Sequence, residues 1–306
     1  MRHVVAILNP QSDRGRTATL GDAFVEATRG QLDLRLLRTT RRGEAVELAR
    51  DAAIAGCDAV VAIGGDGTVH EVANGLMAVA PELRPPLGIV PAGSGNDVAY
   101  ALGISKDLHE NAATIGRTAT RAIDVAAVRA SDGRSCYCTN NVGTLLEGQV
   151  NLKSHELNWP RGSGLYVRAF LQTLFGRLPA AELQLIVDGQ SFTRAACILS
   201  VGNGPRSGGK FLFYPEATNG DGRFDYIIAP PMGRLRMMWE LHKSTRGQAN
   251  RDGLVEHGQF SHLAVRSSIP LAAHVDGEPW LHPADKVYEI EIEVLPAALD
   301  VFVPLR

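Results

Sequence analysis

The sequence predicts an α/β domain with a parallel sheet, followed by an antiparallel β domain. Three observations support this division. The chain has 306 residues, about the length of two ordinary domains. Short apolar strands alternate with helices over residues 1–123, which is typical of βαβ units and a parallel sheet. From residue 124 onward, strands separated by Asp-Gly turns replace that alternation.

The first domain, 1–123, is expected to alternate strands and helices from its start. The apolar runs at 59–63 and 87–90 are continuous, as in strands that are buried on both faces. Over 44–55, alanine and leucine recur at helical spacing. The expected strands are 3–8, 32–37, 59–63 and 87–90, and the expected helices are 17–29, 44–55, 68–79 and 97–102.

The second domain, 124–290, is expected to be mainly antiparallel because turn signals such as Asp188-Gly189 and Asp276-Gly277 separate its apolar runs. Residues 291–306 are expected to form a C-terminal strand, and its return to the first domain is left open. The expected strands are 124–130, 136–140, 181–188, 195–201, 224–228, 263–266, 272–276 and 288–294, with helices at 164–175 and 233–243.

Overall charge and hydropathy narrow the range of partners. The net charge is -2 and the pI is about 6.5, so no basic stripe for nucleic acid is expected. No run approaches the roughly 18 apolar residues of a membrane span. We therefore expect a cytoplasmic protein that binds no nucleic acid. A homodimer is compatible with the sequence, which does not define the oligomeric state.

A glycine-rich turn, Gly64–Thr68, follows a buried strand and opens a helix. The N-terminus of a helix offers unpaired N–H groups and a positive dipole end, which suit phosphate. Asp66 is predicted to hold a magnesium ion that bridges phosphates. No Lys-Ser/Thr pair follows, so the turn is not a Walker A loop. The alternative is a tight strand-to-helix turn in which Thr68 caps the helix.

A second glycine-rich turn, Pro91–Asp97, has the same context of strand, turn and helix. Two such turns at the carboxyl ends of two strands would flank one crevice, where open α/β sheets bind ligands. Ser94 is a candidate phosphate contact. Asn96 and Asp97 are equally good candidates for ligand contact and for capping the next helix.

Several motifs, taken together, resemble the diacylglycerol kinase catalytic-domain family, which includes bacterial lipid kinases and the sphingosine and ceramide kinases. The resemblance covers nearly the whole chain, and GGDGT alone is shared with NAD kinases. The motifs in the first half are ILNP at 7–10, Thr39 before Gly43, GGDGTVHEVANG at 64–75 and PAGSGNDVA at 91–99. Those in the second half are IDV at 123–125, VGN at 201–203, PEA at 215–217, Asp221-Gly222 and VDGE at 275–278.

This resemblance implies a fold like that of NAD kinase and diacylglycerol kinase, in which the second domain is a β-sandwich and the active cleft lies between the domains. It also implies an ATP-dependent lipid kinase that transfers the γ-phosphoryl group to a hydroxyl of diacylglycerol or a related lipid. Such a substrate would be met at the membrane surface, so peripheral attachment to the inner face of the membrane is expected.

The resemblance also implies roles for individual residues around the nucleotide and its phosphates. Nucleotide contacts are expected from Asn9, Pro10, Gln11, Ser12, Asp13 and Thr39. Phosphate contacts are expected from Gly64, Gly65, Asp66, Gly67, Thr68, Val69, His70, Glu71, Ser94 and Asn96.

Glu278 and Asp66 are the predicted catalytic residues. The resemblance assigns Glu278 as the general base, and a carboxylate can accept the proton of the attacking hydroxyl. The alternative is that Asp276-Gly277 forms a hairpin turn with Glu278 as a solvated neighbour. Asp221 is expected to bind a structural magnesium ion with the main-chain carbonyls of Thr218 and Arg223.

Three positions depart from the family pattern. His70 stands where many relatives have Asn, Gly220 stands where many have Asp, and Asp13 replaces a usual glycine. These departures put the structural metal site in doubt and keep a catalytically inactive nucleotide-binding regulator as an alternative. An NAD kinase is a further alternative, but its Asn-Glu pair is absent from the sequence.

Overall fold

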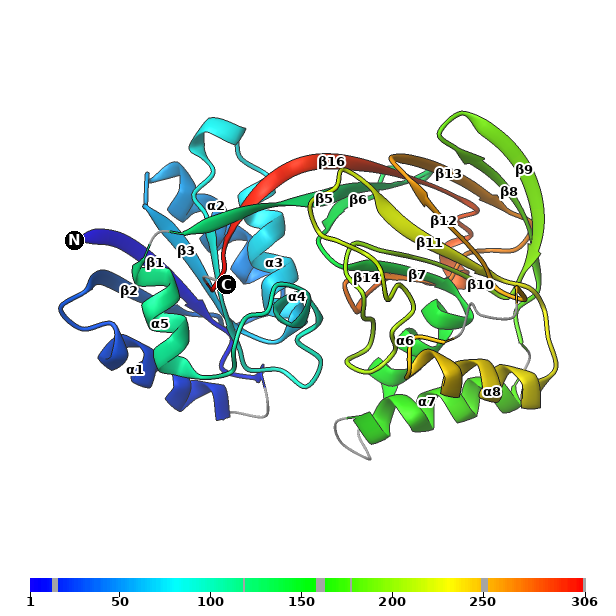
Figure 1. Cartoon of the computed structure of the whole chain (residues 1–306), viewed down its shortest axis with the longest axis horizontal. Coiled ribbons are helices and arrows are strands. Elements are labelled where there is room, and N and C mark those ends of the chain that lie inside the picture. The colour runs from blue at the N-terminus through cyan, green and yellow to red at the C-terminus, as the bar shows by residue number, and fades with distance from the viewer. Residues whose placement is uncertain (13–15, 118, 158–162, 177, 249–252, 305–306) are drawn as a thin grey trace. The chain divides into compact units, whose positions relative to one another are not determined.

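The computed structural model describes residues 1–12, 16–117, 119–157, 163–176, 178–248 and 253–304. The chain divides into two compact units. The first comprises Met1–Val125 and Pro296–Arg306, and the second comprises Ala126–Leu295. Two strands, β5 (Thr120–Ala130) and β16 (Glu289–Phe302), have one end in each unit (Figure 1).

The first unit is built on a parallel sheet with the strand order β2-β1-β3-β4-β16. Strands β3 and β4 are buried throughout, which explains their continuous apolar runs. The C-terminal end of β16 completes this sheet by pairing Val301 with Leu87. The other strands are β1 (Arg2–Leu8), β2 (Leu32–Arg38), β3 (Ala59–Gly64) and β4 (Leu87–Pro91).

The helices of the first unit connect these strands. α2 and α3 pack so closely that a side chain at Gly75 would collide with the carbonyl oxygen of Val46. The sequence pattern does not predict α5, whose N-terminus is capped by the Asp107 carboxylate. The helices are α1 (Arg16–Ala27), α2 (Glu44–Ile54), α3 (Asp66–Met77), α4 (Asp97–Ala101) and α5 (Leu108–Gly116), with a short 3₁₀ turn at Pro81–Leu83.

The second unit contains two antiparallel sheets. One has the order β12-β11-β10-β7-β14-β15, and the other joins the start of β16 to β13, β8 and β9, with β5 and β6 beside β16. Their strands are β6 (Ser135–Cys138), β7 (Asn141–Leu145), β8 (Ala181–Val187), β9 (Gln190–Ala196), β10 (Ile198–Gly202), β11 (Phe224–Ala229), β12 (Glu256–Phe260), β13 (His262–Ser267), β14 (Ala273–Val275) and β15 (Glu278–Leu281).

Apolar side chains from both of these sheets form one buried core, so the second unit is a β-sandwich. Three helices, α6 (Leu146–Glu156), α7 (Ser163–Phe175) and α8 (Arg234–Ser244), contribute to a separate apolar cluster with β10 and β11. The polar sequence of α6 does not predict a helix. The predicted fold class, an α/β domain with a parallel sheet followed by an antiparallel β-sandwich, is confirmed. Among the described residues, no helix is long and apolar enough to cross a bilayer.

Candidate functional site

The carboxyl ends of β1 to β4 meet at one edge of the parallel sheet. The strands end level with one another, since Leu8 pairs with both Arg38 and Ile63, and Ile63 pairs with Val90. The N–H of Thr39 donates to the carbonyl of Leu8 at 2.9 Å. The sheet register therefore brings four sequence-predicted segments, which begin at Asn9, Thr39, Gly64 and Pro91, to the same edge.

The two glycine-rich turns, Gly64–Thr68 and Pro91–Asp97, touch through their backbones; we call this pair the glycine edge. The N–H of Ala92 donates to the carbonyl of Gly64 at 2.7 Å. A Cβ atom on Gly93 would lie 2.5 Å from the Cα of Gly65, and one on Gly65 would lie 3.1 Å from the Cα of Gly93. Glycine is required here because the backbones approach more closely than side chains allow.

The Asp66 carboxylate locks the glycine edge. Its Oδ2 and Oδ1 accept the N–H groups of Asn96 and Asp97, each at 2.7 Å. Asn96 occupies the N-cap position of α4 with φ 54, yet its side chain makes no capping bond there. Instead it bonds both the N–H and the carbonyl of Gly93. Asp66 therefore supplies the cap that Asn96 and Asp97 were candidates for, and magnesium binding by Asp66 stays a prediction.

Glu71 also organises the main chain. Its two carboxylate oxygens accept the N–H groups of Gly43 at 2.9 Å and Ala45 at 3.2 Å, at the start of α2. The alternative of Thr68 as a helix cap is wrong, because α3 begins at Asp66 with Gly65 as its N-cap. Thr68 instead lies 3.4 Å from Ser12, oxygen to oxygen, and so links the first loop to the glycine edge.

The side chains of the remaining residues that are predicted to contact the nucleotide differ in their exposure to solvent. The side chain of Val69 is buried, so only its main chain could face a ligand. Ser94 and Gln11 are exposed, whereas Pro10 and His70 are half-buried. Asp13 lies outside the described residues. The N–H groups of Asn96 and Asp97 at the start of α4 are bonded to the Asp66 carboxylate, so the start of α3 is the part of this edge whose main-chain N–H groups suit an anion.

The predicted acceptor residue Glu278 begins β15 in a two-residue hairpin. Asp276 and Gly277 both have positive φ, 51° and 83°, as a type I′ turn requires. We call residues 273–281 the Glu278 hairpin. The hairpin alternative is thus correct about the turn, but the Glu278 side chain is half-buried and not a fully solvated neighbour.

Asp276 anchors the Glu278 hairpin to the chain before β7. This buried carboxylate accepts N–H groups from three consecutive residues, Thr139 at 3.0 Å, Asn140 at 2.8 Å and Asn141 at 3.0 Å. A carboxylate with that many donors is strongly stabilised as an anion. Asp276 is therefore used to fix the turn of the hairpin, and the role of Glu278 as general base stays a prediction.

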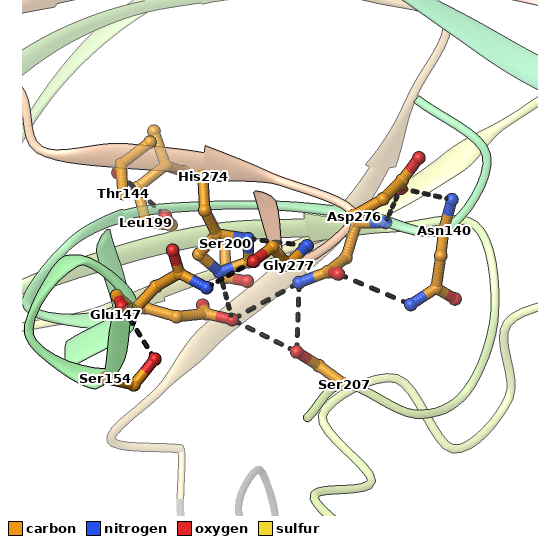
Figure 2. Close-up of polar contacts among 12 residues, drawn as sticks. Asn140, Thr144, Glu147, Ser154, Leu199, Ser200, Ser207, His274, Asp276 and Gly277 are labelled. Atoms are coloured by element: carbon orange, nitrogen blue, oxygen red, sulfur yellow. Dashed lines mark hydrogen bonds and ion pairs between the residues drawn. The ribbon is translucent and has the colours of Figure 1, made fainter. Parts of the chain in front are cut away.

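A second anchor lies behind the hairpin and was not anticipated from the sequence (Figure 2). The N–H of Gly277 donates to His274 Nδ1 at 3.2 Å, and His274 Nε2 lies 3.3 Å from Glu147 Oε1. Since Nδ1 accepts a hydrogen bond, the ring proton is assigned to Nε2, which donates to Glu147. Ser207 adds a hydrogen bond to the same carboxylate oxygen at 3.1 Å.

The environment of Glu147 keeps it charged. Burial acts to raise the pKa of Glu147, but the hydrogen bonds that it makes with His274, Ser200 and Ser207 hold that pKa below its ordinary value. Glu147 reaches this place because Leu145, with φ 57 and ψ -115, makes a strained turn from β7 into α6. Glu147 and His274 are 127 residues apart, so no local pattern could have paired them.

The predicted structural metal residues lie in the loop before β11. The exposed Asp221 accepts the N–H of Arg223 at 3.1 Å. Burial, with Asp221 and Glu216 adding to it, raises the pKa of the nearby Asp225 to about 6. Metal binding in this loop stays a prediction. No group of three or more His, Cys, Asp or Glu side chains in the described part of the chain is placed to hold a metal ion, so any such site would need main-chain carbonyls such as those of Thr218 and Arg223.

Two family descriptions match the sequence over almost its whole length. Residues 3–128 match the diacylglycerol kinase catalytic domain, and residues 140–303 match the YegS C-terminal NAD kinase beta sandwich-like domain. A probable lipid kinase YegS-like from Chromohalobacter salexigens is 31% identical over 80% of this chain and 77% of its own. A diacylglycerol kinase from Mycobacterium tuberculosis is 32% identical over 77% of this chain and 75% of its own.

Solved structures share the fold. A crystal structure described as a diacylglycerol kinase from Bacillus anthracis superposes with a TM-score of 0.79, covering 99% of this chain and 97% of its own at 24% identity. The chain belongs to the diacylglycerol kinase catalytic-domain family, whose members include lipid kinases.

Proposed function

We propose that this protein is an ATP-dependent lipid kinase that transfers the γ-phosphoryl group to a hydroxyl of diacylglycerol or a related lipid alcohol. The glycine edge carries the proposal. Two turns that are 27 residues apart, from Gly64 to Pro91, meet so closely that only glycine fits between them, and Asp66 ties one to the other. The main chain beside this contact, at the start of α3, is proposed to bind the phosphates of the nucleotide.

The proposed donor half uses the main chain of Gly64–Glu71 and of Ser94–Asn96 for the phosphates. Asn9–Asp13 and Thr39 are proposed to contact the rest of the nucleotide. In this reading Asp66 and Glu71 shape the loops through the N–H groups that they accept. The donor half is therefore preorganised before the nucleotide arrives, which reduces the entropic cost of ordering it.

The proposed acceptor half uses Glu278 as the general base. Phosphoryl transfer needs little covalent help from the protein beyond positioning, charge stabilisation and acceptance of the hydroxyl proton. Asp276 and His274, which both precede Glu278, fix the turn of the hairpin and so restrict where this carboxylate lies. Magnesium, when bound with the nucleotide, would offset the phosphate charge. A further magnesium held at Asp221, with carbonyls of Thr218 and Arg223, would offset the charge around Asp225.

A substrate panel tests this proposal. The purified protein is incubated with ATP and Mg²⁺ and with diacylglycerol, a sphingoid base, a ceramide or phosphatidylglycerol in mixed micelles, and the phosphorylated lipid is measured. NAD is included as a soluble acceptor. We expect phosphorylation of at least one lipid alcohol and none of NAD. Nucleotide binding without transfer to any acceptor would favour the inactive regulator, and transfer to NAD alone would favour an NAD kinase.

A further inference from the structure

Helix α8 carries apolar side chains on its outer face. Leu235, Met238 and Trp239 are 84%, 42% and 56% exposed. Their spacing of three and four residues places them on one side of the helix. The opposite side is buried, through Met237, Glu240 and Ser244. A helix on the surface of a soluble protein normally turns polar residues outward. The outer face of α8 is apolar instead, unlike an ordinary solvated surface.

Helix α7 repeats the pattern. Val167, Leu171 and Phe175 recur every four residues and are 53%, 36% and 71% exposed. The inner face of α7 is buried through Ala169 and Leu174. Two helices that are about 70 residues apart in the sequence thus share one feature, an apolar stripe that the second unit does not cover.

The end of α7 meets the start of α8 (Figure 1). Arg234, at the start of α8, donates to the carbonyl of Leu174 at 2.8 Å and to that of Gly176 at 3.2 Å, at the end of α7. Leu174 and Met237 pack into the same apolar cluster. We call the set of Val167, Leu171, Phe175, Leu235, Met238 and Trp239 the outer stripe.

Positive charge accompanies the outer stripe. The two helices hold four bases, Arg168, Arg234, Arg236 and Lys243, against one acid, Glu240, which gives a formal charge of +3. Glu240 is buried and bonded to Arg236 at 2.7 Å and to Lys243 at 2.9 Å, and Lys243 is itself only 13% exposed, so the positive charge at the surface comes from the arginines. Apolar residues including a tryptophan, bordered by cations, are the features of helices that lie in the interface of an anionic bilayer.

We propose that the outer stripe docks this protein onto the surface of an anionic lipid bilayer, where a lipid substrate would be met. The statement that a lipid substrate is met there rests on the proposed function. The docking itself does not, because lipid binding can be measured without catalysis. A second copy of the chain fits the stripe less well, since a twofold contact would bring the same cations of each copy together.

The fluorescence of Trp239 reports docking directly. The chain has three tryptophans, so the double variant Trp159→Phe/Trp280→Phe keeps Trp239 alone. With vesicles of phosphatidylglycerol and phosphatidylethanolamine, we expect a blue shift of its emission and quenching by brominated acyl chains. Phosphatidylcholine vesicles should bind at least about threefold more weakly, and added salt should weaken binding to the anionic vesicles.

A matched pair of variants locates the surface. The triple variant Leu235→Ser/Met238→Ser/Trp239→Ser, assayed by vesicle sedimentation, should bind anionic vesicles about tenfold more weakly or worse. The control Ile186→Ser/Tyr288→Ser changes exposed apolar residues outside these helices and should bind normally. All these side chains are exposed, so the variants should fold, which circular dichroism checks.

Distinct outcomes separate the two proposals. Unchanged vesicle binding by the triple variant would overturn the docking surface, as would a lipid-free dimer that the triple variant abolishes. Vesicle binding through the outer stripe without phosphorylation of any lipid would leave the docking surface standing and reject the kinase proposal. If both hold, the triple variant should lose activity on vesicle-embedded lipid and keep it on a soluble short-chain lipid.

Discussion

The glycine edge and the Glu278 hairpin are built in opposite ways. At the glycine edge, the carboxylates of the motif accept main-chain N–H groups from neighbouring loops, as Asp66 does from Asn96 and Asp97. At the hairpin, Asp276 does the holding and the adjacent Glu278 is left half-buried. In the first region, side chains fix the position of the main chain. In the second, Asp276 fixes the hairpin that carries the Glu278 side chain.

This difference fits the roles proposed for the two regions, phosphate binding at the glycine edge and proton acceptance at Glu278. A phosphate-binding surface needs many weak donors in a fixed array, which glycine-rich main chain supplies. A proton acceptor needs a single basic atom in a fixed place, which an anchored hairpin supplies. Substitutions in the two regions should therefore have separable effects on nucleotide affinity and on turnover.

The largest expected effect is on turnover at the hairpin. Glu278→Gln removes the proposed proton acceptor and keeps its size, so kcat should fall about 10²- to 10⁴-fold while ATP affinity stays nearly unchanged. Steady-state kinetics on the preferred lipid and nucleotide-binding calorimetry measure the two effects. Glu182→Gln, on the exposed face of β8, is the control. Full turnover in the Glu278 variant would show that the base lies elsewhere.

The next effect concerns the anchor behind the hairpin. His274→Ala leaves the buried Glu147 carboxylate without its main partner, so the free energy of unfolding should fall by about 3–5 kcal/mol. Chemical denaturation measures this loss, and His109→Ala, on the exposed side of α5, is the control. Adding Glu147→Gln should recover part of the loss. If the double variant is no more stable than His274→Ala, the charge of Glu147 is not the cause.

At the glycine edge the expected effect falls on affinity. Gly93→Ala places a Cβ atom 2.5 Å from the Cα of Gly65, so the turns must separate. Such overpacking costs about 1–3 kcal/mol, and ATP should bind about tenfold more weakly or worse. Gly116→Ala is a matched control, since its Cβ would meet only Gln31 Oε1 at an ordinary 3.5 Å. Equal ATP affinity in both variants would show that the glycine edge does not bind the nucleotide.

The smallest effect concerns the acidic loop before β11. The pKa of Asp225 is raised from 3.8 to about 6 in the folded chain, so the folded state holds this proton more tightly than the unfolded state. Its stabilising contribution is present below pH 4 and is lost as the pH rises through about 6. Between pH 4 and 7, the free energy of unfolding of Asp225→Asn should therefore change less than that of the wild-type chain, by on the order of 1 kcal/mol. Thermal unfolding at several pH values measures the difference.

Thermal unfolding in the presence of Mg²⁺ tests whether this acidic loop binds a cation. If Asp221 holds a cation beside Asp225, Mg²⁺ should raise the melting temperature of the wild-type chain at pH 7, because binding to the folded state stabilises it. Asp221→Asn should remove that rise. An equal rise in both proteins would place the magnesium effect elsewhere in the chain.

Local patterns predicted the layered architecture because each element carries its own signal. The apolar runs of β3 and β4 predicted buried parallel strands, and Asp276-Gly277 predicted a hairpin turn. Helix α6 was missed because its polar sequence lacks a clear apolar stripe. It forms where Leu146 enters the apolar cluster and Gly148 packs closely against the carbonyl of Ala272.

Residue patterns alone predicted the succession of strands and glycine turns and carried the motifs of the family. The partner that each polar group received could be read only from the fold. Asp66 bonds main-chain groups about 30 residues away, and Glu147 meets His274 across 127 residues. The physical reason is that strand order and the packing of neighbouring elements set such contacts, and local residue spacing carries no record of either.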